Sequence, residues 1–238
     1  MSIDVNRRFY REAAAVQNDG WRIALDGKVV KTPARNPLVL PTQALAEAIA
    51  AEWAAQDVKV KPHTMPLMQL ASTAIDRVAP DREPIIAETA GYAATDLVCY
   101  RADGPAELVA RQAAQWDPLI DWLRERYDVS LQVAAGVMAI PQSDQALAIL
   151  ARAVAAQDDP RLTALAVMTG AAGSLAIGLA LLEGRLGPEE AAAVAQLDEL
   201  FQAERWGLDP EAEKRRTGQK ADLVAARRFL DLLATGTA

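Results

Sequence analysis

Few residues in this sequence could do chemistry. The chain contains one His, His63, and one Cys, Cys99. A zinc site needs several His, Cys or carboxylate ligands at suitable spacing, and a Ser-His-Asp triad would have to use His63. A lone His in a linker such as Lys61-Pro-His-Thr64 is typically solvated, and a Cys in an apolar stretch is typically buried. We therefore expect no metal, no cofactor and no catalytic role for either residue.

Paired carboxylates are the remaining route to catalysis. Asp117 and Asp121 are four residues apart and would share a helix face, but Pro118 lies between them. Asp198 and Glu199 are adjacent, so on a helix their side chains point about 100° apart. Acid–base catalysis needs a carboxyl group with a raised pKa in a pocket, which a sequence does not display. A carboxylate-based enzyme working in a cleft between two domains therefore stays open as an alternative.

The glycine-rich segment Thr169-Gly-Ala-Ala-Gly-Ser174 has no Lys, unlike a phosphate-binding P-loop. It lies inside residues 162–182, which carry no charge and are long enough to cross a membrane. This segment contains three Gly, and no belt of Trp or Tyr flanks it. We predict one central helix over 160–183 that other helices bury on most sides, with close contacts at its glycines and no stable membrane insertion.

A surface signature appears on a helix predicted over 188–206. Ala193, Leu197 and Leu200 form an apolar stripe that should face the core. Glu199, Gln202 and Trp206 form a second stripe at spacing i, i+3, i+7. An acid, an amide and a Trp suit a protein interface, where Trp anchors and charge orients. A solvated face with Trp206 folded back onto the protein remains the alternative.

The elements that would carry these residues fall into two groups. Short β-prone runs at 21–25 and 28–33 flank Asp26-Gly27, a strong signal for a hairpin with a type I′ turn. Further strands are predicted at 9–16 and 38–40, and a helix from Thr42 to about Gln56. Helical patterns then dominate, at 65–78, 83–94, 105–127, 142–156 and 210–234, with a possible strand pair of 96–101 beside 131–140. Pro118 predicts a kink or break in the helix 105–127.

The fold class predicted from this order is α+β. A small β-rich two-layer domain with one helix is expected over residues 1–62, followed by a larger, mainly helical domain over 63–238. Apolar residues make up 51% of the 238 residues, enough for a packed core.

The net charge of −7 argues against nucleic acid and against an anionic membrane surface as partners. The first eleven residues show no signal peptide or presequence, and a single Cys fits a reducing compartment. We therefore expect the chain to stay where it is made, in the bacterial cytoplasm.

A series of short motifs, ordered along nearly the whole chain, resembles a known family, the assembly chaperones of the ATP synthase catalytic sector that bind its alpha subunit. The motifs are Arg8-Phe-Tyr10, Gly20-Trp21, Leu25-Asp-Gly27, Lys31-Thr-Pro33, Asn36-Pro-Leu38, Leu40-Pro-Thr42, Ala51-Glu-Trp53, Met65-Pro-Leu67, Ala74-Ile-Asp76, Tyr92, Thr95-Asp-Leu97, Cys99-Tyr-Arg101, Gln112, Trp116-Asp-Pro118, Gly173-Ser174, Asp198-Glu199, Gln202, Trp206-Gly207 and Asp209. Phe201 departs from the pattern, where Trp or Tyr is expected.

The resemblance implies a chaperone that uses no nucleotide and catalyses no covalent reaction. Its partner would be the free ATP synthase alpha subunit, bound at the surface that later meets the beta subunit, and eukaryotic relatives would work in the mitochondrial matrix. The family's functionally sensitive acid matches Glu199, and the partner-binding residues implied around it are Asp198, Gln202, Trp206 and Asp209. No small-molecule substrate is expected. A scaffolding protein that stays bound permanently remains a third possibility.

Overall fold

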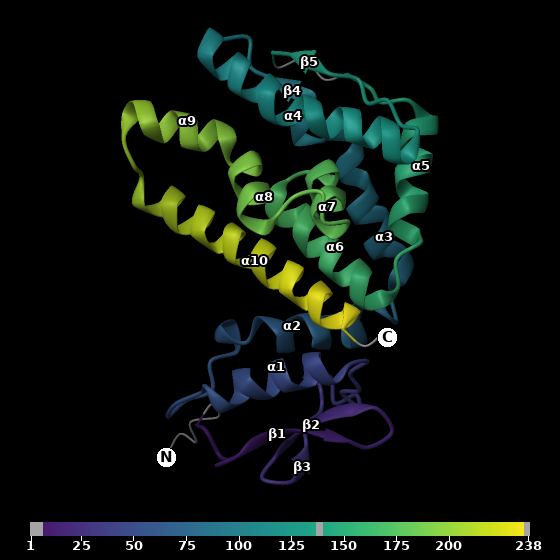
Figure 1. The fold of residues 1–238 in the computed structure, drawn as a ribbon, viewed down its shortest axis with the longest axis vertical. Coiled ribbons are helices and arrows are strands. Elements are labelled where there is room, and N and C mark those ends of the chain that lie inside the picture. Colours follow the sequence, from purple (N-terminus) through teal and green to yellow (C-terminus); the bar gives the residue numbers. More distant parts are fainter. Residues whose placement is uncertain (1–6, 137–139, 236–238) are drawn as a thin grey trace. The chain divides into compact units, whose positions relative to one another are not determined.

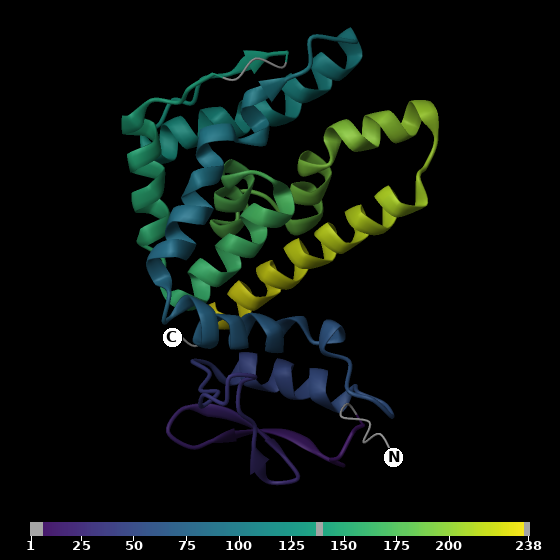
Figure 2. The same ribbon diagram turned by 180° about the vertical axis from the view of Figure 1, so that it is seen from behind.

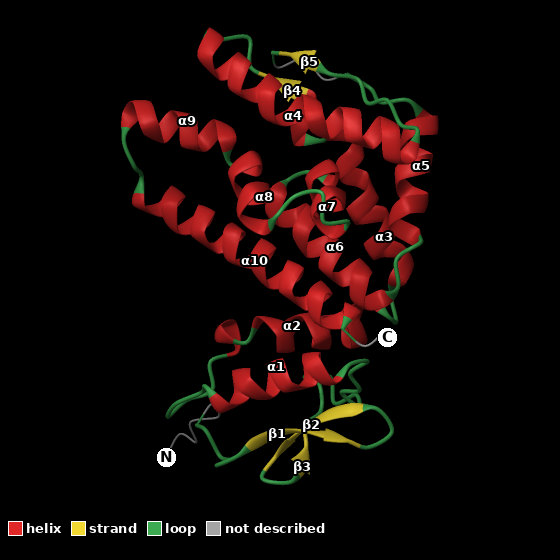
Figure 3. Cartoon of the chain, viewed as in Figure 1, coloured by secondary structure: helices red, strands yellow, loops and turns green. Residues whose placement is uncertain are grey.

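The computed structural model describes residues 7–136 and 140–235, and its chain is shown in Figure 1. A small antiparallel sheet comes first and helices follow (Figure 3), so the predicted α+β class is confirmed. The chain divides into two compact units. The N-terminal unit comprises Met1–Arg82 together with Arg228–Ala238, and the helical unit comprises Glu83–Arg227.

The sheet of the N-terminal unit has the strand order β1-β2-β3, with β1 at Ala13–Gln17, β2 at Trp21–Leu25 and β3 at Lys28–Val29. Asp26 and Gly27 both have positive φ, 47° and 78°, as the predicted turn requires. The strand predicted at 9–16 begins later, at Ala13. The strand predicted at 38–40 is reduced to one bridge, between Leu40 and Trp21.

Helix α1 (Gln43–Ala54) packs on one face of this sheet (Figures 1 and 2). Its predicted start is confirmed, because the hydroxyl of Thr42 caps the helix and accepts the N–H of Leu45 at 3.2 Å. Leu45 and Ile49 are buried beneath it, at 1% and 0% exposure. The helix therefore supplies the second layer of a two-layer unit.

Helix α2 (Pro66–Thr73) also belongs to the N-terminal unit, and η2 (Ala74–Val78) extends it with a π-helical turn. Glu52 on α1 accepts the N–H groups of Leu67 and Met68 at 2.8 and 2.9 Å. A carboxylate at a helix N-terminus is favourable, and burial raises its pKa. These bonds join α1 to α2 within a unit that extends to Arg82, past residue 62, where a domain boundary is predicted.

Three of the family motifs meet at Asp76 in the N-terminal unit. Its carboxylate accepts the hydroxyl of Thr32 at 2.7 Å, the side-chain amide of Asn36 at 2.8 Å and the N–H of Ala34 at 3.0 Å. These bonds fix the turn over residues 32–36, in which Arg35 has φ of 68°. Motifs that are some 40 residues apart in sequence therefore form one local structure.

The helical unit is built from eight α-helices, in the residues that the structure describes, and one two-stranded parallel sheet. The sheet pairs β4 (Tyr100–Arg101) with β5 (Ala134–Ala135), which agrees with part of the predicted pair, although residues 137–139 lie outside the described chain. The helices are α3 (Arg82–Gly91), α4 (Ala106–Tyr127), α5 (Asp144–Ala155), α6 (Asp159–Ala172), α7 (Leu175–Leu182), α8 (Pro188–Ala195), α9 (Leu197–Trp206) and α10 (Pro210–Ala234). The first residue of α3 and the residues of α10 from Arg228 onward belong to the N-terminal unit. The helical unit also contains the 3-10 turns η3 at Tyr92–Thr95 and η4 at Leu97–Cys99, whereas the 3-10 turn η1 at Pro62–Thr64 belongs to the N-terminal unit.

A kink or a break was predicted at Pro118, and helix α4 passes through this residue without a break. Pro118 and Ala114, whose carbonyl loses its N–H partner, are both exposed, so water can satisfy that carbonyl. Trp116 and Leu119 anchor the helix on its buried side, at 0% and 1% exposure. The indole of Trp116 also donates to the carbonyl of Val194 at 3.1 Å.

The single helix predicted over 160–183 is wrong, because the chain forms two helices there. Gly173 ends α6 with φ of 65°, and Ser174 begins α7 by accepting the N–H of Ile177 at 3.0 Å. Of the three glycines predicted to make close contacts, Gly178 does so, because an added Cβ there would lie 2.5 Å from Oγ1 of Thr169. The prediction is wrong at Gly173, where nothing lies within 4 Å of such a Cβ, and at Gly170 the nearest atom, Oη of Tyr92, is 3.9 Å away. In the described residues, no helix is both long and apolar enough to cross a membrane.

Asp96 supports this break from a distant part of the chain. Its carboxylate accepts the hydroxyl of Ser174 at 2.6 Å and the N–H groups of Ala176 and Val98 at 3.0 and 3.2 Å. The residue is 1% exposed, and burial raises the pKa of its carboxyl against the lowering effect of these bonds. Asp96 thus joins the segment before β4 to the first turn of α7.

Candidate protein-contact site

The helix predicted over 188–206 is interrupted at Gln196, which separates α8 from α9. The interruption changes which side chains face the core. Leu197 is buried as predicted, but Ala193 and Leu200 are exposed, so the predicted apolar stripe is wrong at those two positions. Ala192, Val194 and Phe201 are buried instead.

The residues predicted to bind a partner lie on α9 and on the connection to α10 (Figure 1). Gln202 and Asp209 are exposed, and the indole of Trp206, at the end of α9, is 77% exposed. This exposure disagrees with the alternative in which Trp206 folds back onto the protein. Leu208, which the sequence analysis did not single out, is 65% exposed beside it.

Glu199 joins α9 to α10 rather than standing alone. Its Oε2 lies 3.0 Å from Nη2 of Arg215 and 3.8 Å from Nη1 of Arg216, and its side chain is 37% exposed. The backbone carbonyl of Arg216 accepts the side-chain amide of Gln196 at 2.9 Å. The start of α9 is therefore tied to α10 at two points, while Oε1 of Glu199 has no partner among the described residues.

Asp198 faces the other way, toward α4. Its Oδ1 accepts the side-chain amide of Gln112 at 2.7 Å. Gln112 is 1% exposed, and its own amide oxygen accepts the N–H of Ala102 at 2.8 Å. Asp198 therefore has a structural role as the acceptor of a buried amide, which a sequence motif of two adjacent acids does not reveal.

Asp209 caps the helix that follows the exposed connection. Its Oδ1 accepts the N–H of Glu211 at 3.0 Å at the start of α10. Pro210 occupies the first helical position and Glu211 lies in the first turn, positions that favour a Pro and an acid. The connection from Trp206 to Asp209 is thus short and ends in a capped helix.

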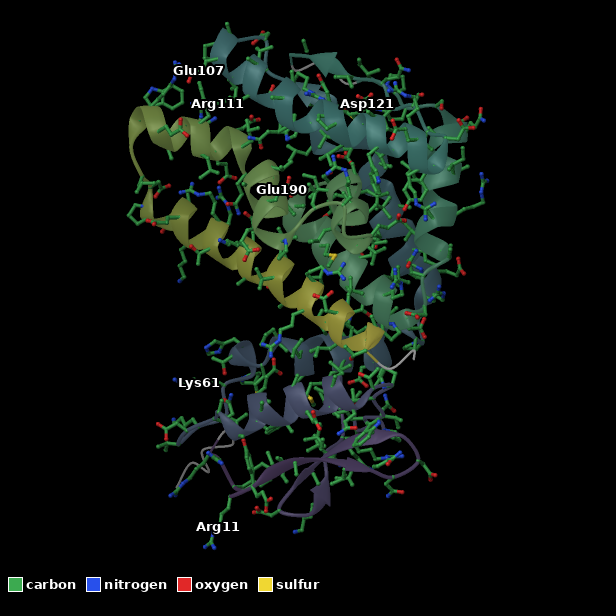
Figure 4. All side chains as sticks on the ribbon, viewed as in Figure 1. Arg11, Lys61, Glu107, Arg111, Asp121 and Glu190 are labelled. Atoms are coloured by element: carbon green, nitrogen blue, oxygen red, sulfur yellow. The ribbon has the colours of Figure 1, made fainter. Side chains whose placement is uncertain are left out.

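Charged side chains also hold the far end of α9 against α4, where Figure 4 labels Glu107 and Arg111. Glu204 lies 2.7 Å from Arg111, and Arg205 lies 2.7 Å from Glu107. These two arginines lower the pKa of Glu107 through their hydrogen bonds. Sequence reasoning had no signal for these pairs, because they join residues more than 90 positions apart.

Phe201 lies between the same two arginines. The guanidinium carbons of Arg111 and Arg205 lie 5.1 and 4.5 Å from the centre of its ring, within the range of cation–π attraction. The ring is 2% exposed. Phe201 thus keeps an aromatic ring at the position where Trp or Tyr is expected.

The residues considered first as catalytic candidates are Cys99, His63, Asp117 and Asp121, and their environments do not favour catalysis. Burial raises the pKa of the Cys99 thiol to about 12, so the thiolate needed for nucleophilic attack is scarce at neutral pH. His63 is exposed in η1. Asp117 pairs with Arg101 at 2.8 Å and Asp121 pairs with Arg124, so these two carboxylates serve different cations. Across residues 7–136 and 140–235, no three His, Cys, Asp or Glu residues cluster closely enough to hold a metal ion.

The exposed Trp206 and Leu208, together with the paired charges on α9, have the composition of a protein-contact surface. Such a surface is typical of proteins that bind other proteins. Comparison with known proteins identifies the family. Residues 7–124 match the family model of the ATP12 chaperone protein.

Solved structures of that family are similar over almost the entire chain. The crystal structure of Atp12 from Paracoccus denitrificans is 41% identical and superposes with a TM-score of 0.90, covering 96% of this chain and 98% of that one. A variant of the P. denitrificans protein, with one aspartate replaced by lysine, gives the same values. The mitochondrial protein atp12 of Schizosaccharomyces pombe is 26% identical over 214 residues, which are 84% of this chain and 74% of that protein.

This chain belongs to the ATP12 chaperone family. That is the family of ATP synthase assembly chaperones that its motifs resemble, and membership places the chain among chaperones and not among enzymes.

Proposed function

We propose that this chain binds the free alpha subunit of the ATP synthase catalytic sector in the bacterial cytoplasm, and shields the surface that later meets the beta subunit. A subunit of an obligate oligomer exposes a large apolar interface before assembly. A chaperone must cover that interface well enough to prevent aggregation and weakly enough to be displaced. Membership of the ATP12 family supports this role.

The observation that carries the proposed site is the exposed indole of Trp206, 77% accessible at the end of a helix whose orientation is fixed by ion pairs. Large aromatic side chains dominate the binding energy of many interfaces. Leu208 adds apolar area beside the indole, and Gln202 adds an exposed amide. Trp206 therefore serves as the anchor in this proposal, with Gln202 and Asp209 around it.

Glu199 contributes charge to the same site. Its Oε2 is held by Arg215 and Arg216, which fixes the carboxylate, while Oε1 is left to accept a hydrogen bond from the client. Asp198 contributes indirectly, since its bond to Gln112 holds the first turn of α9 in place. Four of the five predicted residues are thus proposed to contact the client: Glu199, Gln202, Trp206 and Asp209. The fifth, Asp198, positions the helix.

The experiment that tests the function is co-expression of this chain with the alpha subunit or the beta subunit, each alone, followed by affinity capture of this chain. We expect capture of soluble alpha and not of beta, and release of alpha when beta is added. Failure to capture alpha, with both chains folded, would contradict the proposal. Retention of this chain in the mature enzyme after beta is added would instead identify a permanent scaffold.

The site is tested by Trp206→Ala, with Phe9→Ala as its control. Phe9 is also 77% exposed, but it lies in the N-terminal unit, before β1. We expect the Trp206 variant to weaken alpha binding by about thirtyfold, a cost of about 2 kcal/mol, as at other aromatic anchors. Equal affinities of the two variants would remove Trp206 from the site and leave the proposed function standing.

A further inference from the structure

The sheet of the N-terminal unit has one face under α1 and an opposite face that no helix in the described part of that unit covers (Figures 1 and 3). Side chains alternate between the two faces along each strand. Ile23 and Leu25, at 0% and 5% exposure, point toward the α1 side. The strand registers then assign six residues to the other side, which we call the open sheet face: Ala14, Val16, Arg22, Ala24, Val29 and Val39.

These residues form two adjacent rows. In the first row, Val16 pairs with Arg22, and the bridge between Trp21 and Leu40 brings Val39 to the other side of Arg22. In the second row, Ala24 pairs with Ala14 on one side and with Val29 on the other. Val29 and Val39 are 43% and 41% exposed. Ala14, Val16 and Arg22 are partly exposed, and Ala24 at the centre of the second row is 5% exposed. The open sheet face is therefore an apolar surface with one arginine in it, and its exposed apolar area lies mainly at Val29 and Val39.

An antiparallel sheet that keeps one face in water normally alternates apolar and polar residues. Strand β1, with the sequence Ala-Ala-Ala-Val-Gln, is apolar on both faces until its last residue. Contiguous exposed apolar residues mark surfaces that another molecule covers. The composition of β1 and the exposure of Val29 and Val39 thus suit a face that is covered when the protein works.

Arg22 indicates the chemistry of the covering molecule. Its Nε donates to the carbonyl of Asn18 at 2.8 Å, which fixes the guanidinium near the turn between β1 and β2. In residues 7–136 and 140–235, its two Nη groups have no hydrogen-bond or ion-pair partner. A planar guanidinium held in this way matches a carboxylate, which can accept two parallel bonds.

The surrounding charge has the same sign as Arg22. Residues 7–41 contain seven Arg or Lys and three Asp or Glu, a net charge of +4 within a chain whose net charge is −7. One of those acids, Asp26, is occupied by the N–H groups of Arg11 and Glu12 at 2.9 to 3.1 Å. The sheet region therefore carries a positive field that attracts acidic surfaces.

We propose that the open sheet face is a second contact surface for the client chain, and that it takes an apolar segment of the client that carries an Asp or Glu opposite Arg22. This inference rests on the proposed function for the identity of the client. A second copy of this chain fits less well, because the sheet regions of the two copies would carry charge of the same sign. The client segment is thus defined by apolar side chains and negative charge.

The test measures the affinity of the full chain for purified alpha subunit with Arg22→Glu, using Lys28→Glu as a matched control. Lys28 pairs with Leu25 and is exposed, so the control makes the same charge change on the opposite side of the sheet. We expect Arg22→Glu to weaken binding about tenfold at low salt and less at high salt, with Lys28→Glu within about twofold of the wild type. Equal affinities of the two variants would overturn the proposal.

A second variant, Val39→Asp, tests the face without removing a hydrogen bond, in case Arg22→Glu fails to fold. It places a carboxylate beside Arg22 and should also weaken alpha binding about tenfold while leaving the melting temperature near that of the wild type. If the wild type binds the alpha subunit and both variants bind it equally well, this inference alone is overturned. If the wild type itself fails to bind the alpha subunit, the proposed function is contradicted. A wild-type dimer that Arg22→Glu converts to monomer would assign the face to self-association instead.

Discussion

Two carboxylates of the helical unit each join segments that are distant in sequence, but in opposite environments. Asp96 is 1% exposed and accepts bonds from Ser174, Ala176 and Val98, all neutral donors. Glu199 is 37% exposed and pairs with Arg215 and Arg216 across α9 and α10. Loss of a hydrogen-bond acceptor lowers the free energy of unfolding strongly at a buried site and weakly at a surface. Asp96 should therefore matter mainly for folding, and Glu199 mainly for binding.

The largest effect is expected for Asp96→Ala, which leaves three buried donors without their acceptor. We expect the free energy of unfolding to fall by about 3 kcal/mol or more, and the melting temperature to fall by roughly 6 to 12 °C. Urea denaturation followed by circular dichroism measures the first quantity. Asp103→Ala is the control, at an exposed acid of the same unit. A similar loss of unfolding free energy in both variants would show that the buried hydrogen bonds of Asp96 contribute no more to stability than an exposed acid does.

Glu199→Lys should change binding far more than stability. It places a third cation beside Arg215 and Arg216, and we expect affinity for the alpha subunit to fall about thirtyfold while the free energy of unfolding changes by less than about 1 kcal/mol. Calorimetric melting and a binding titration measure the two quantities on the same sample. A large loss of stability would move Glu199 into the same category as Asp96.

A charge exchange sharpens the role of Glu199. Combining Glu199→Lys with Arg215→Glu restores an ion pair between α9 and α10 but removes the carboxylate from its position on α9. We expect the double variant to stay defective in alpha binding, because Oε1 of Glu199 is proposed to meet the client directly. Recovery of binding in the double variant would show that Glu199 acts only by positioning α10.

Asp198 lies between the two extremes. Its partner Gln112 is buried, while Asp198 itself is half-buried. Asp198→Ala should therefore lower the free energy of unfolding by about 1 kcal/mol, measured by urea denaturation. The conservative variant Asp198→Asn keeps an acceptor oxygen and should lose less. Identical losses in the two variants would indicate that the bond to Gln112 does not hold α9.

The smallest effect is the pH dependence caused by Asp96. Burial raises the pKa of this carboxyl, so the folded protein holds the proton more tightly than the unfolded chain. The stabilisation from protonation is complete below the ordinary carboxyl pKa of about 3.9 and is lost as pH rises through the raised value. The free energy of unfolding of the wild type, relative to Asp96→Asn, should thus decrease from pH 4 upward. An increase would mean that the hydrogen bonds outweigh burial.

Local patterns were sufficient to predict several elements of this fold. The Asp26-Gly27 turn and the start of α1 at Thr42 follow from backbone preferences that act over a few residues. The order of strands and helices then defined the α+β class. The motifs along the chain also sufficed for the family.

Other features depend on residues that are far apart in sequence. The break between α6 and α7 involves Ser174 and Asp96, 78 residues apart, and an apolar segment by itself favours one continuous helix. The orientation of Glu199 depends on Arg215, 16 residues away across a helical hairpin. The stripe through Ala193 and Leu200 failed because the interruption at Gln196 rotates α9 relative to α8.

By itself, the sequence determined which elements form, where many of them start and which family the chain belongs to, because capping, turn and periodicity preferences are local. Only the tertiary structure decided which acids are buried acceptors and which are surface charges. It also decided that Trp206 is exposed and that, within the described residues of the N-terminal unit, no helix covers one face of the sheet. Burial and pairing are properties of the neighbours that folding brings together, and the spacing of residues along the chain does not contain them.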